Sequence, residues 1–140
     1  MWTQVRFAGR GVESPMPHRM QIQVRFNDTD ALGHVNNSAY AHYAELGRLY
    51  CLRSLEVEVG KLILARLELD FRRQVRFGDD VSVETGVDRI GNSSIHMGQK
   101  IFVGEEIAAE AISVVVHFDY EAGKPIRIPD RLREKLGFPA

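Results

Sequence analysis

The chain has 140 residues, which is enough for one domain with a single hydrophobic core. Its composition is that of an ordinary globular protein, and its formal net charge of −1 provides no field that would attract nucleic acid or an anionic membrane. No apolar run approaches the roughly 18 residues that span a bilayer. The one cysteine, Cys51, cannot form an internal disulfide, so we expect a buried thiol in a reducing cytoplasm.

Residues 1–18 lack the continuous apolar core of a signal peptide, and we expect them to form a poorly ordered extension. The domain itself is expected over residues 19–140. It begins with apolar and polar residues that alternate from Met20 to Asn27, a period of two that indicates a half-buried strand. The pair Asn27-Asp28 consists of turn formers and is expected to end that strand.

A helical pattern follows over residues 37–55. Apolar residues lie on most of its circumference, which is typical of a largely buried helix. Four polar residues share one stripe of this helix, and that stripe could face solvent, a partner subunit or a site. They are Ser38, His42, Glu45 and Arg48.

The remainder of the chain alternates with the period of a strand. The last strand is apolar on both faces and is expected to be central, and Pro129 is expected to open a short helix through about Leu136. One sheet around one helix is an α+β domain, and its uncovered edges favour homo-oligomerisation. The expected strands after the helix span residues 63–77, 81–87, 95–103 and 107–118.

The stretch "DTDALGHVNN" is followed by tyrosines, a glutamate and an arginine at helical spacing. This pattern resembles the acyl-CoA thioesterases of the 4-hydroxybenzoyl-CoA thioesterase family. Two further segments, "VRFGDDV" and "RIGNSSI", extend the resemblance over residues 19–138. It implies the hotdog fold, in which a five-stranded antiparallel sheet wraps one long buried helix. It also implies hydrolysis of an acyl-CoA to free acid and CoA-SH by a homodimer or homotetramer, with no cofactor.

Thioester hydrolysis needs a group that attacks carbon or activates water, and donors that stabilise the oxyanion. A carboxylate next to a helix N-terminus supplies both. In the resemblance, Asp30 matches the catalytic carboxylate and the backbone N–H of Asn37 matches the carbonyl-polarising donor. From composition alone, Asp30 could equally cap the turn or the helix, and Asp28 is expected to form a local structural turn.

Three neighbours of Asp30 are also candidates. His34 matches a catalytic histidine of the related acyl-carrier-protein thioesterases, although it could instead pack against a second subunit. Asn36 could contact substrate or cap the helix, as Asn37 also could. Gly33 is expected to allow a positive φ or close approach of the substrate to the backbone.

Other candidates lie farther along the chain. Ser93 and Ser94 match a region that lines the pantetheine channel or the thioester pocket of related enzymes, and turn chemistry explains them equally well. Glu45 matches a catalytic helix glutamate of another branch, but an ion pair with His42 or Arg48 is the preferred interpretation. Arginine favours phosphate, and the candidates for contact with the CoA phosphates are Arg72, Arg73, Arg76 and Arg127.

Two other functions stay open at this point. A hotdog hydratase or dehydratase could use Asp30 and His34 as an acid–base pair, but the proline-containing motif of that branch is absent. A non-catalytic acyl-thioester-binding domain would keep the fold without turnover. The five histidines show no ligand spacing, so no metal site is expected. Acyl specificity, and CoA against acyl-carrier protein, are left open.

Overall fold

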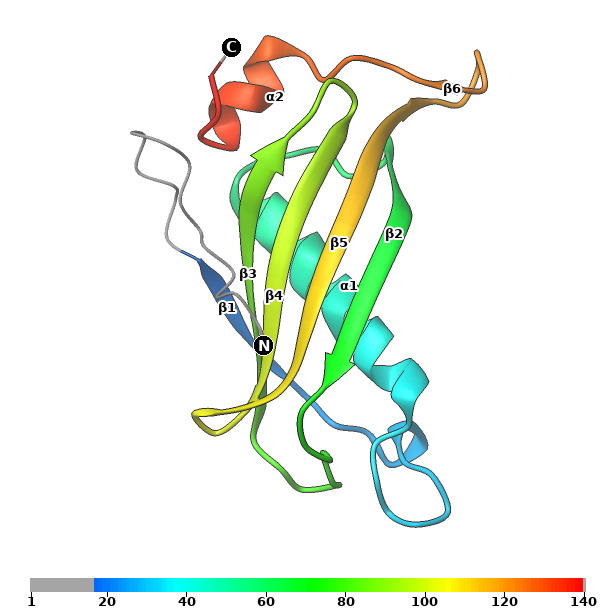
Figure 1. Ribbon diagram of the computed structural model, residues 1–140, viewed down its shortest axis with the longest axis vertical. Helices are drawn as coiled ribbons and strands as arrows, with labels where there is room; N and C mark the ends of the chain where they lie inside the picture. The colour runs from blue at the N-terminus through cyan, green and yellow to red at the C-terminus, as the bar shows by residue number, and fades with distance from the viewer. Residues whose placement is uncertain (1–16, 140) are drawn as a thin grey trace.

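The computed structural model describes residues 17–139, so the expected extension at 1–18 lies almost wholly outside the described residues. This part of the chain forms six strands, two α-helices and one short 3₁₀ turn (Figure 1). In chain order they are β1 (His18–Ile22), η1 (Phe26–Asp28), α1 (Asn37–Ser54), β2 (Leu62–Phe71), β3 (Val81–Ile90), β4 (Ser94–Val103), β5 (Glu106–Asp119), β6 (Lys124–Pro125) and α2 (Asp130–Lys135).

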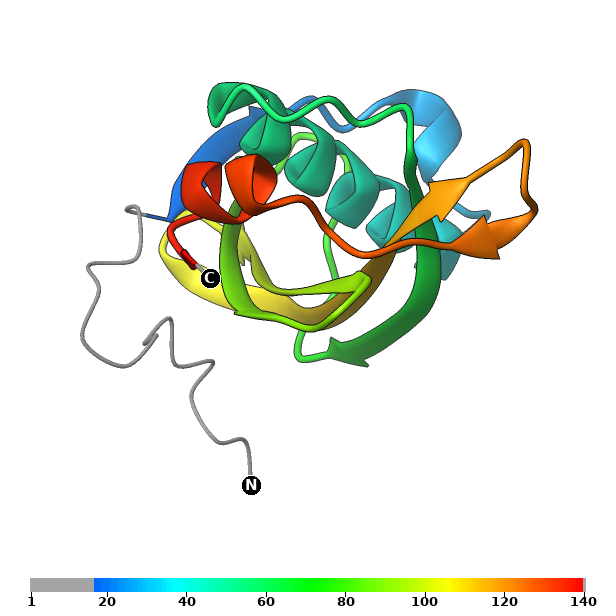
Figure 2. The ribbon, with the colours of Figure 1, turned by 90° about the horizontal axis from the view of Figure 1, so that it is seen from above.

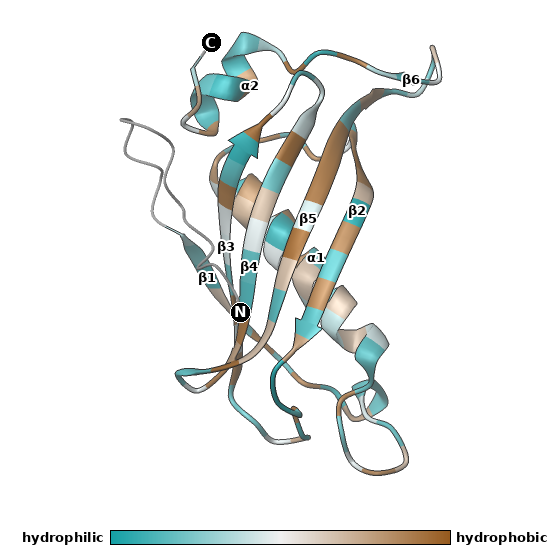
Figure 3. Cartoon of the chain, in the orientation of Figure 1, coloured by the Kyte–Doolittle hydropathy of each residue, from teal (hydrophilic) through white to brown (hydrophobic). Residues whose placement is uncertain are grey.

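The strands form one antiparallel sheet in the order β1-β3-β4-β5-β2, and the two-residue β6 pairs with the end of β5. The last long strand, β5, is hydrogen-bonded to β4 on one side and β2 on the other. This confirms its expected central position, and Figure 3 shows the long apolar stretch of the strand. The expected α+β class, with one long helix packed on an antiparallel sheet, is confirmed.

Helix α1 lies in the hollow of the curved sheet, which wraps around it in Figure 2. Its sheet-facing side is buried, with Tyr43 1% and Ala44 0% exposed, whereas Tyr50 on the other side is 45% exposed. Cys51 is buried on the sheet-facing side, and burial raises the pKa of its thiol to about 11. The thiol therefore stays protonated and packs as a small apolar group, as expected.

The first strand is shorter than the alternation predicts. β1 ends at Ile22, and Phe26, which should have pointed inward, is 76% exposed. The cause is Asp28, whose carboxylate accepts the Arg25 N–H at 2.9 Å and closes a 3₁₀ turn over Phe26–Asp28. A local side-chain bond therefore ends the strand before the hydrophobic pattern does.

The second strand also ends early, at Phe71 rather than residue 77. Val75 is completely buried, but its N–H donates to the Tyr40 hydroxyl at 3.0 Å and its carbonyl accepts from Val35 at 2.7 Å. The segment after β2 therefore leaves the sheet and attaches to α1 and to the loop before it. Phe77, at the end of the predicted strand, is 59% exposed.

The expected polar stripe of α1 is interrupted at Arg48. Ser38, His42 and Glu45 are at least partly exposed, but Arg48 is 6% exposed. Its guanidinium reaches the buried side chains of Gln99 on β4 and Ser113 on β5, which accept hydrogen bonds from it. An arginine stem is long enough to carry the charged group from a helix flank to polar groups inside the core.

Gly47 sets the distance between α1 and the sheet. A Cβ atom at this position would lie 2.6 Å from Val83 Cγ1 and 2.8 Å from both Gln99 Nε2 and Thr85 Oγ1. All three neighbours are buried on strands, so none can move aside freely. The glycine is therefore required by close packing of the helix on β3 and β4.

We expect Gly47→Ala to destabilise the protein by about 1–3 kcal/mol, because the added methyl group forces α1 away from the sheet. Gly60→Ala is the matched control, since a Cβ at Gly60 meets no atom within 4 Å. The measurement is the free energy of unfolding in urea. Equal stability of the two variants would contradict the close packing described for Gly47.

Candidate functional site

The loop before α1 is tied to the helix by the buried carboxylate of Asp28. That carboxylate accepts the Tyr43 hydroxyl at 2.8 Å, the Arg25 N–H at 2.9 Å and the Arg25 guanidinium at 3.0 Å. The Asp28 carbonyl accepts the Asn36 N–H at 2.7 Å. Asp28 thus joins the start of the loop both to the middle of α1 and to the residue just before the helix, which agrees with its expected structural role.

These bonds also set the charge of Asp28. Burial alone would raise the pKa of its carboxyl, but the hydrogen bonds from the Arg25 backbone, the Tyr43 hydroxyl and the Arg25 guanidinium outweigh burial and lower the pKa below its ordinary value of 3.8. The carboxylate in turn contributes to the raised pKa of Tyr43, after burial of the phenol itself. The pair therefore exists as a carboxylate and a neutral phenol at neutral pH.

Asp30 lies on the loop that this network holds, and its side chain is exposed. Its Oδ1 accepts the N–H groups of Leu32 at 2.9 Å and His34 at 3.1 Å, and its own N–H donates to the His34 carbonyl at 2.7 Å. Oδ2 accepts no hydrogen bond from any residue between 17 and 139. One carboxylate oxygen is thus fixed by the backbone, and the other is open to a substrate or a water molecule.

The N-terminus of α1 supplies a free amide next to this carboxylate. Asn36 is the cap, because its Oδ1 accepts the Ser38 N–H at 3.0 Å, and the Asn36 carbonyl accepts the Ala39 N–H at 2.9 Å. The Asn37 N–H has no acceptor within the described part of the chain. It is therefore an unpaired donor at the positive end of an 18-residue helix.

A pocket of about 270 Å³ brings these groups together. Asp30, His34 and Asn37, the three residues expected to be catalytic, all line it. Tyr40 of α1 and the segment that leaves the sheet after β2 also line it. The further lining residues are Val35, Phe71, Arg72, Arg73 and Gln74.

Tyr40 and Phe71 were not expected at the site. The rings meet edge to face with their centroids 5.0 Å apart, and the Tyr40 hydroxyl donates to the Arg73 carbonyl at 3.3 Å. In the sequence, each residue belongs to an ordinary apolar face. They come together only because α1 packs against the end of β2, so no local sequence signal could have identified them.

The expected substrate-binding residues lie outside this pocket. Gly33 has a φ of +79°, which confirms the expected positive φ. Asn36 uses its side-chain oxygen in the helix cap. Ser93 and Ser94 belong to the β3–β4 turn, which lies at the opposite end of the sheet from the loop before α1 (Figure 1).

The bonds at the β3–β4 turn explain why serines suit it. The Ser94 hydroxyl lies 3.2 Å from His96 Nε2, and the Ser94 carbonyl accepts the Gly91 N–H at 2.7 Å. The Ser93 carbonyl accepts the His117 N–H at 2.8 Å. Within one chain, the two serines therefore serve the turn.

The charged candidates are mostly paired. Arg72 forms an ion pair with Glu110 at 3.1 Å, and Arg73 pairs with Glu106 at the pocket rim. Glu45 Oε1 lies 4.0 Å from His42 Nδ1, which agrees with the expected ion pair between Glu45 and His42. The alternative partner, Arg48, is not in contact with Glu45 but donates to Gln99 and Ser113. The other candidates are Arg76 and Arg127. The backbone N–H of Arg76 donates to the Asp79 carboxylate, and the Arg127 guanidinium pairs with Asp130.

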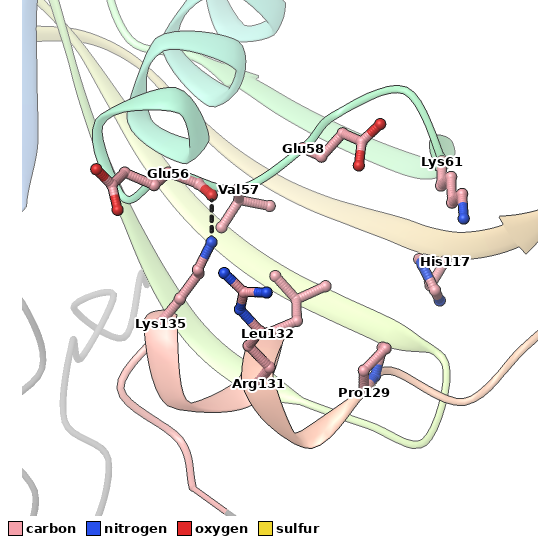
Figure 4. A pocket seen from close by; sticks show the side chains of 9 residues that line it. All are labelled: Glu56, Val57, Glu58, Lys61, His117, Pro129, Arg131, Leu132 and Lys135. Carbon is pink, nitrogen blue, oxygen red and sulfur yellow. Dashed lines mark hydrogen bonds between the residues drawn. The ribbon is translucent and has the colours of Figure 1, made fainter.

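A larger pocket, about 450 Å³, lies at the other end of the molecule between α2 and the loop before β2 (Figure 4). Lys61, Arg131 and His117 line it together with Glu56 and Glu58. His117 is buried, and its Nδ1 has no partner among the described residues. The helix at this pocket is α2, which has only six residues.

Among residues 17–139, no group of three or more histidine, cysteine, aspartate or glutamate side chains is placed to hold a metal ion. No helix in the same range is long and apolar enough to cross a membrane.

The model of the thioesterase-like superfamily matches residues 24–136, nearly all of the described chain. The chain belongs to this superfamily. It is 30% identical over 128 residues to the chloroplastic acyl-acyl carrier protein thioesterase ATL3 of Arabidopsis thaliana, covering 85% of this chain and 67% of that protein. It is 25% identical over 120 residues to the acyl-CoA thioesterase YbgC of Haemophilus influenzae, covering 80% and 88%.

A thioesterase from Thermus thermophilus, solved with coenzyme A and zinc, has a similar structure. The TM-score is 0.79 at 33% sequence identity, and the match covers 84% of this chain and 90% of that one. The match confirms the hotdog thioesterase fold that the resemblance implied. In the present chain, the pocket at the α1 N-terminus is lined by the exposed carboxylate of Asp30 and by Asn37, the first residue of the helix.

We expect Asp28→Asn to destabilise the protein by about 1–3 kcal/mol at neutral pH, because the buried charge-assisted bonds are weakened. The folded-state pKa of Asp28 is lowered, so its contribution to stability is present above pH 3.8 and is lost as the pH falls through the folded-state pKa. The gap in stability between wild type and variant should therefore shrink on acidification.

Urea unfolding measured over a pH series checks this expectation, with Asp88→Asn on the exposed part of β3 as the control. Tyr43→Phe should destabilise the protein as well, since it removes the same buried hydrogen bond. A stability difference for Asp28→Asn that stays constant across the acidic range would show that the carboxylate is not held as described.

Proposed function

We propose that this protein hydrolyses acyl-CoA thioesters to a free acid and CoA-SH at the pocket beside the N-terminus of α1. The proposal is carried by two groups that line one pocket: the Asp30 carboxylate, with one oxygen that accepts no hydrogen bond from residues 17–139, and the Asn37 N–H, which has no acceptor in that range. The coenzyme A bound to the Thermus relative supports the choice of substrate.

The thioester carbonyl would accept a hydrogen bond from the Asn37 N–H. As the carbonyl becomes tetrahedral, its oxygen gains negative charge, which the helix dipole and this N–H stabilise. The donor is fixed by the cap at Asn36, so little reorganisation is needed when the charge develops. The pocket opening then sets the direction from which the acyl carbon is attacked.

Asp30 Oδ2 has two routes to product. As a general base it removes a proton from water while the water oxygen bonds to the carbonyl carbon, and the C–S bond then breaks as the proton passes to the leaving thiolate. As a nucleophile it bonds to the carbonyl carbon itself, expels the thiolate and forms a mixed anhydride, which water then hydrolyses. In both routes the two backbone bonds to Oδ1 hold the carboxylate in place. His34 lines the same pocket and would be a second proton carrier.

We also propose that the enzyme acts as a homodimer joined at β2. Within the described chain, β2 pairs only with β5, which leaves its other edge open, and it carries the exposed side chains Leu64 and Phe71. Open edges of this kind are normally covered. Two copies of β2 related by a two-fold axis would pair as antiparallel strands, in keeping with the rest of the sheet.

Such a dimer would complete the site. Antiparallel pairing places the Phe71 end of one β2 beside the Leu62 end of the other. Leu62 lies opposite His117 on β5. His117 lines the larger pocket, and its backbone N–H donates to the Ser93 carbonyl. The second subunit's larger pocket, with its lysine and arginine side chains, would then lie near the first subunit's Asp30 and offer cations to CoA phosphates.

The compartment that we propose is the cytoplasm. The protein's one cysteine, Cys51, is a buried free thiol with a raised pKa, which suits a reducing environment and gives no structural role to oxidation.

We expect Asp30→Asn to lower kcat/KM for acyl-CoA hydrolysis about 100-fold or more, because the amide is neither a base nor a nucleophile. Its oxygen can still accept the two backbone N–H groups, so folding should be retained. Asp119→Asn is the matched control: Oδ1 of Asp119 accepts two backbone N–H groups in a similar turn, and Asp119 lines neither the Asp30 pocket nor the larger pocket. The measurement is release of free thiol from a panel of acyl-CoAs. Full activity in Asp30→Asn would remove Asp30 from the chemistry.

We expect light scattering after gel filtration to give a mass about twice the 15.9 kDa of the chain. Leu64→Lys should shift the population toward monomer, since lysine on an edge strand disfavours strand pairing. Tyr120→Lys, at another exposed apolar position, should leave the mass unchanged. A monomeric wild type, or a dimer indifferent to Leu64→Lys, would contradict an interface at β2.

A further inference from the structure

Arg48 is a buried cation whose hydrogen-bond acceptors are neutral. Its side chain is 6% exposed, and Nη1 donates to Ser113 Oγ at 3.0 Å and to Gln99 Oε1 at 3.4 Å. Neither Nε nor Nη2 donates to any other group between residues 17 and 139. Because guanidinium carries five N–H donors, most of the hydrogen-bonding capacity of Arg48 is unused by the protein.

The charge itself lacks a close acidic partner in the described part of the chain. Burial lowers the pKa of the Arg48 guanidinium, against a smaller opposing influence of Glu45. The Glu45 carboxylate is exposed and lies near His42 rather than in contact with Arg48. Buried arginines are normally paired with an acid, since loss of water from an unpaired charge is unfavourable. The guanidinium is therefore suited to an oxygen atom supplied from outside the protein.

Arg48 also lines a hollow of about 240 Å³ between α1 and β2. Apart from Arg48 and Glu45, every residue that lines this hollow is apolar, and the hollow is separate from the pocket that contains Asp30. The apolar residues are Leu49, Leu52, Val59, Leu62, Leu64 and Val115. Apolar lining around a small number of placed polar groups is typical of sites for small molecules.

The hollow and the Asp30 pocket lie along the same two elements. Asn37 at the first site and Arg48 at the second are 11 residues apart on α1, which corresponds to about 16 Å along the helix axis. The strand runs beside them, with Phe71 at the Asp30 pocket and Leu64 at the hollow. The distance between the two sites along α1 therefore corresponds to the length of a long acyl chain whose thioester carbonyl lies at Asn37.

We propose that the hollow receives the far end of the acyl chain and that Arg48 there binds a neutral oxygen, a hydroxyl or a carbonyl, so that the preferred substrates are long acyl groups oxygenated near their end. This inference rests on the proposed thioesterase function. A plain methyl end would displace water from the unused guanidinium donors and leave those donors without an acceptor. A hydroxyl or carbonyl oxygen would accept a hydrogen bond in place of the displaced water. Glu45 at the same hollow disfavours a carboxylate in that position, which is why the oxygen is neutral.

Binding of non-hydrolysable thioethers of coenzyme A tests the proposal without requiring turnover. We would compare plain alkyl chains with the same chains carrying a terminal hydroxyl, from octyl to hexadecyl, by isothermal titration calorimetry. The hydroxylated ligand should bind roughly tenfold more tightly once the chain is long enough to reach Arg48, since the added bond is made to a charged donor. Chains too short to reach Arg48 should show no preference, which provides an internal control.

Arg48→Met should abolish the preference for the hydroxylated chain and bind plain chains more tightly than wild type does. Methionine keeps an unbranched apolar stem, and replacing a buried charge by an apolar group of similar size is commonly tolerated by the fold. Arg53→Met is the matched control on the exposed side of α1. Leu49→Trp provides a second test, because it fills the hollow and should weaken binding of long chains of both kinds.

Equal binding of plain and hydroxylated long chains by wild type would overturn the proposal, as would a preference that survives in Arg48→Met. Failure of either ligand to bind would overturn it too. Thiol release from the corresponding thioesters separates this inference from the proposed function. A hydroxyl preference in binding without any thioester turnover would refute the thioesterase proposal and leave Arg48 as a ligand-binding residue. Turnover without the preference would support the thioesterase proposal and refute the role of Arg48.

Discussion

The buried carboxylate of Asp28 is the constraint on which the site depends. It accepts hydrogen bonds from Tyr43 in the middle of α1 and from Arg25 just after the first strand, while its carbonyl holds Asn36. The loop between these points has little freedom, so the Asp30 carboxylate is held beside the first free amide of the helix. The same bonds end β1 early, because the turn that they close replaces strand pairing.

The part of the candidate pocket that is local in the chain could be predicted from the sequence. Asp30, His34 and Asn37 lie within eight residues of one another, and a loop leading into a helix necessarily keeps such residues close. The strands whose alternation continues through their length could be predicted as well. The end of a strand could not be predicted where a contact distant in sequence determines it. The Tyr40 hydroxyl accepts the Val75 N–H, and β2 therefore ends before its apolar pattern does.

The region between α1 and β2 combines two chemical environments along one helix. At its N-terminus are an exposed carboxylate and an unpaired amide, suited to a reacting carbonyl. Farther along, Arg48 lies in an apolar hollow, suited to the end of a chain. Gly47, next to Arg48, lets α1 approach the sheet closely enough for the guanidinium to reach Gln99. The packing that stabilises the helix therefore also shapes the chamber beside it.

In the proposed reaction, Asn37 and Asp30 act together on one thioester carbonyl. The most direct measurement is a crystal structure with an acyl-CoA analogue in which a methylene group replaces the thioester sulfur, leaving a stable ketone. We expect the ketone oxygen to accept the Asn37 N–H and Asp30 Oδ2 to face the carbonyl carbon, directly or through one water molecule. A ketone bound away from the α1 N-terminus, with Asp30 contacting neither the ligand nor such a water, would contradict it.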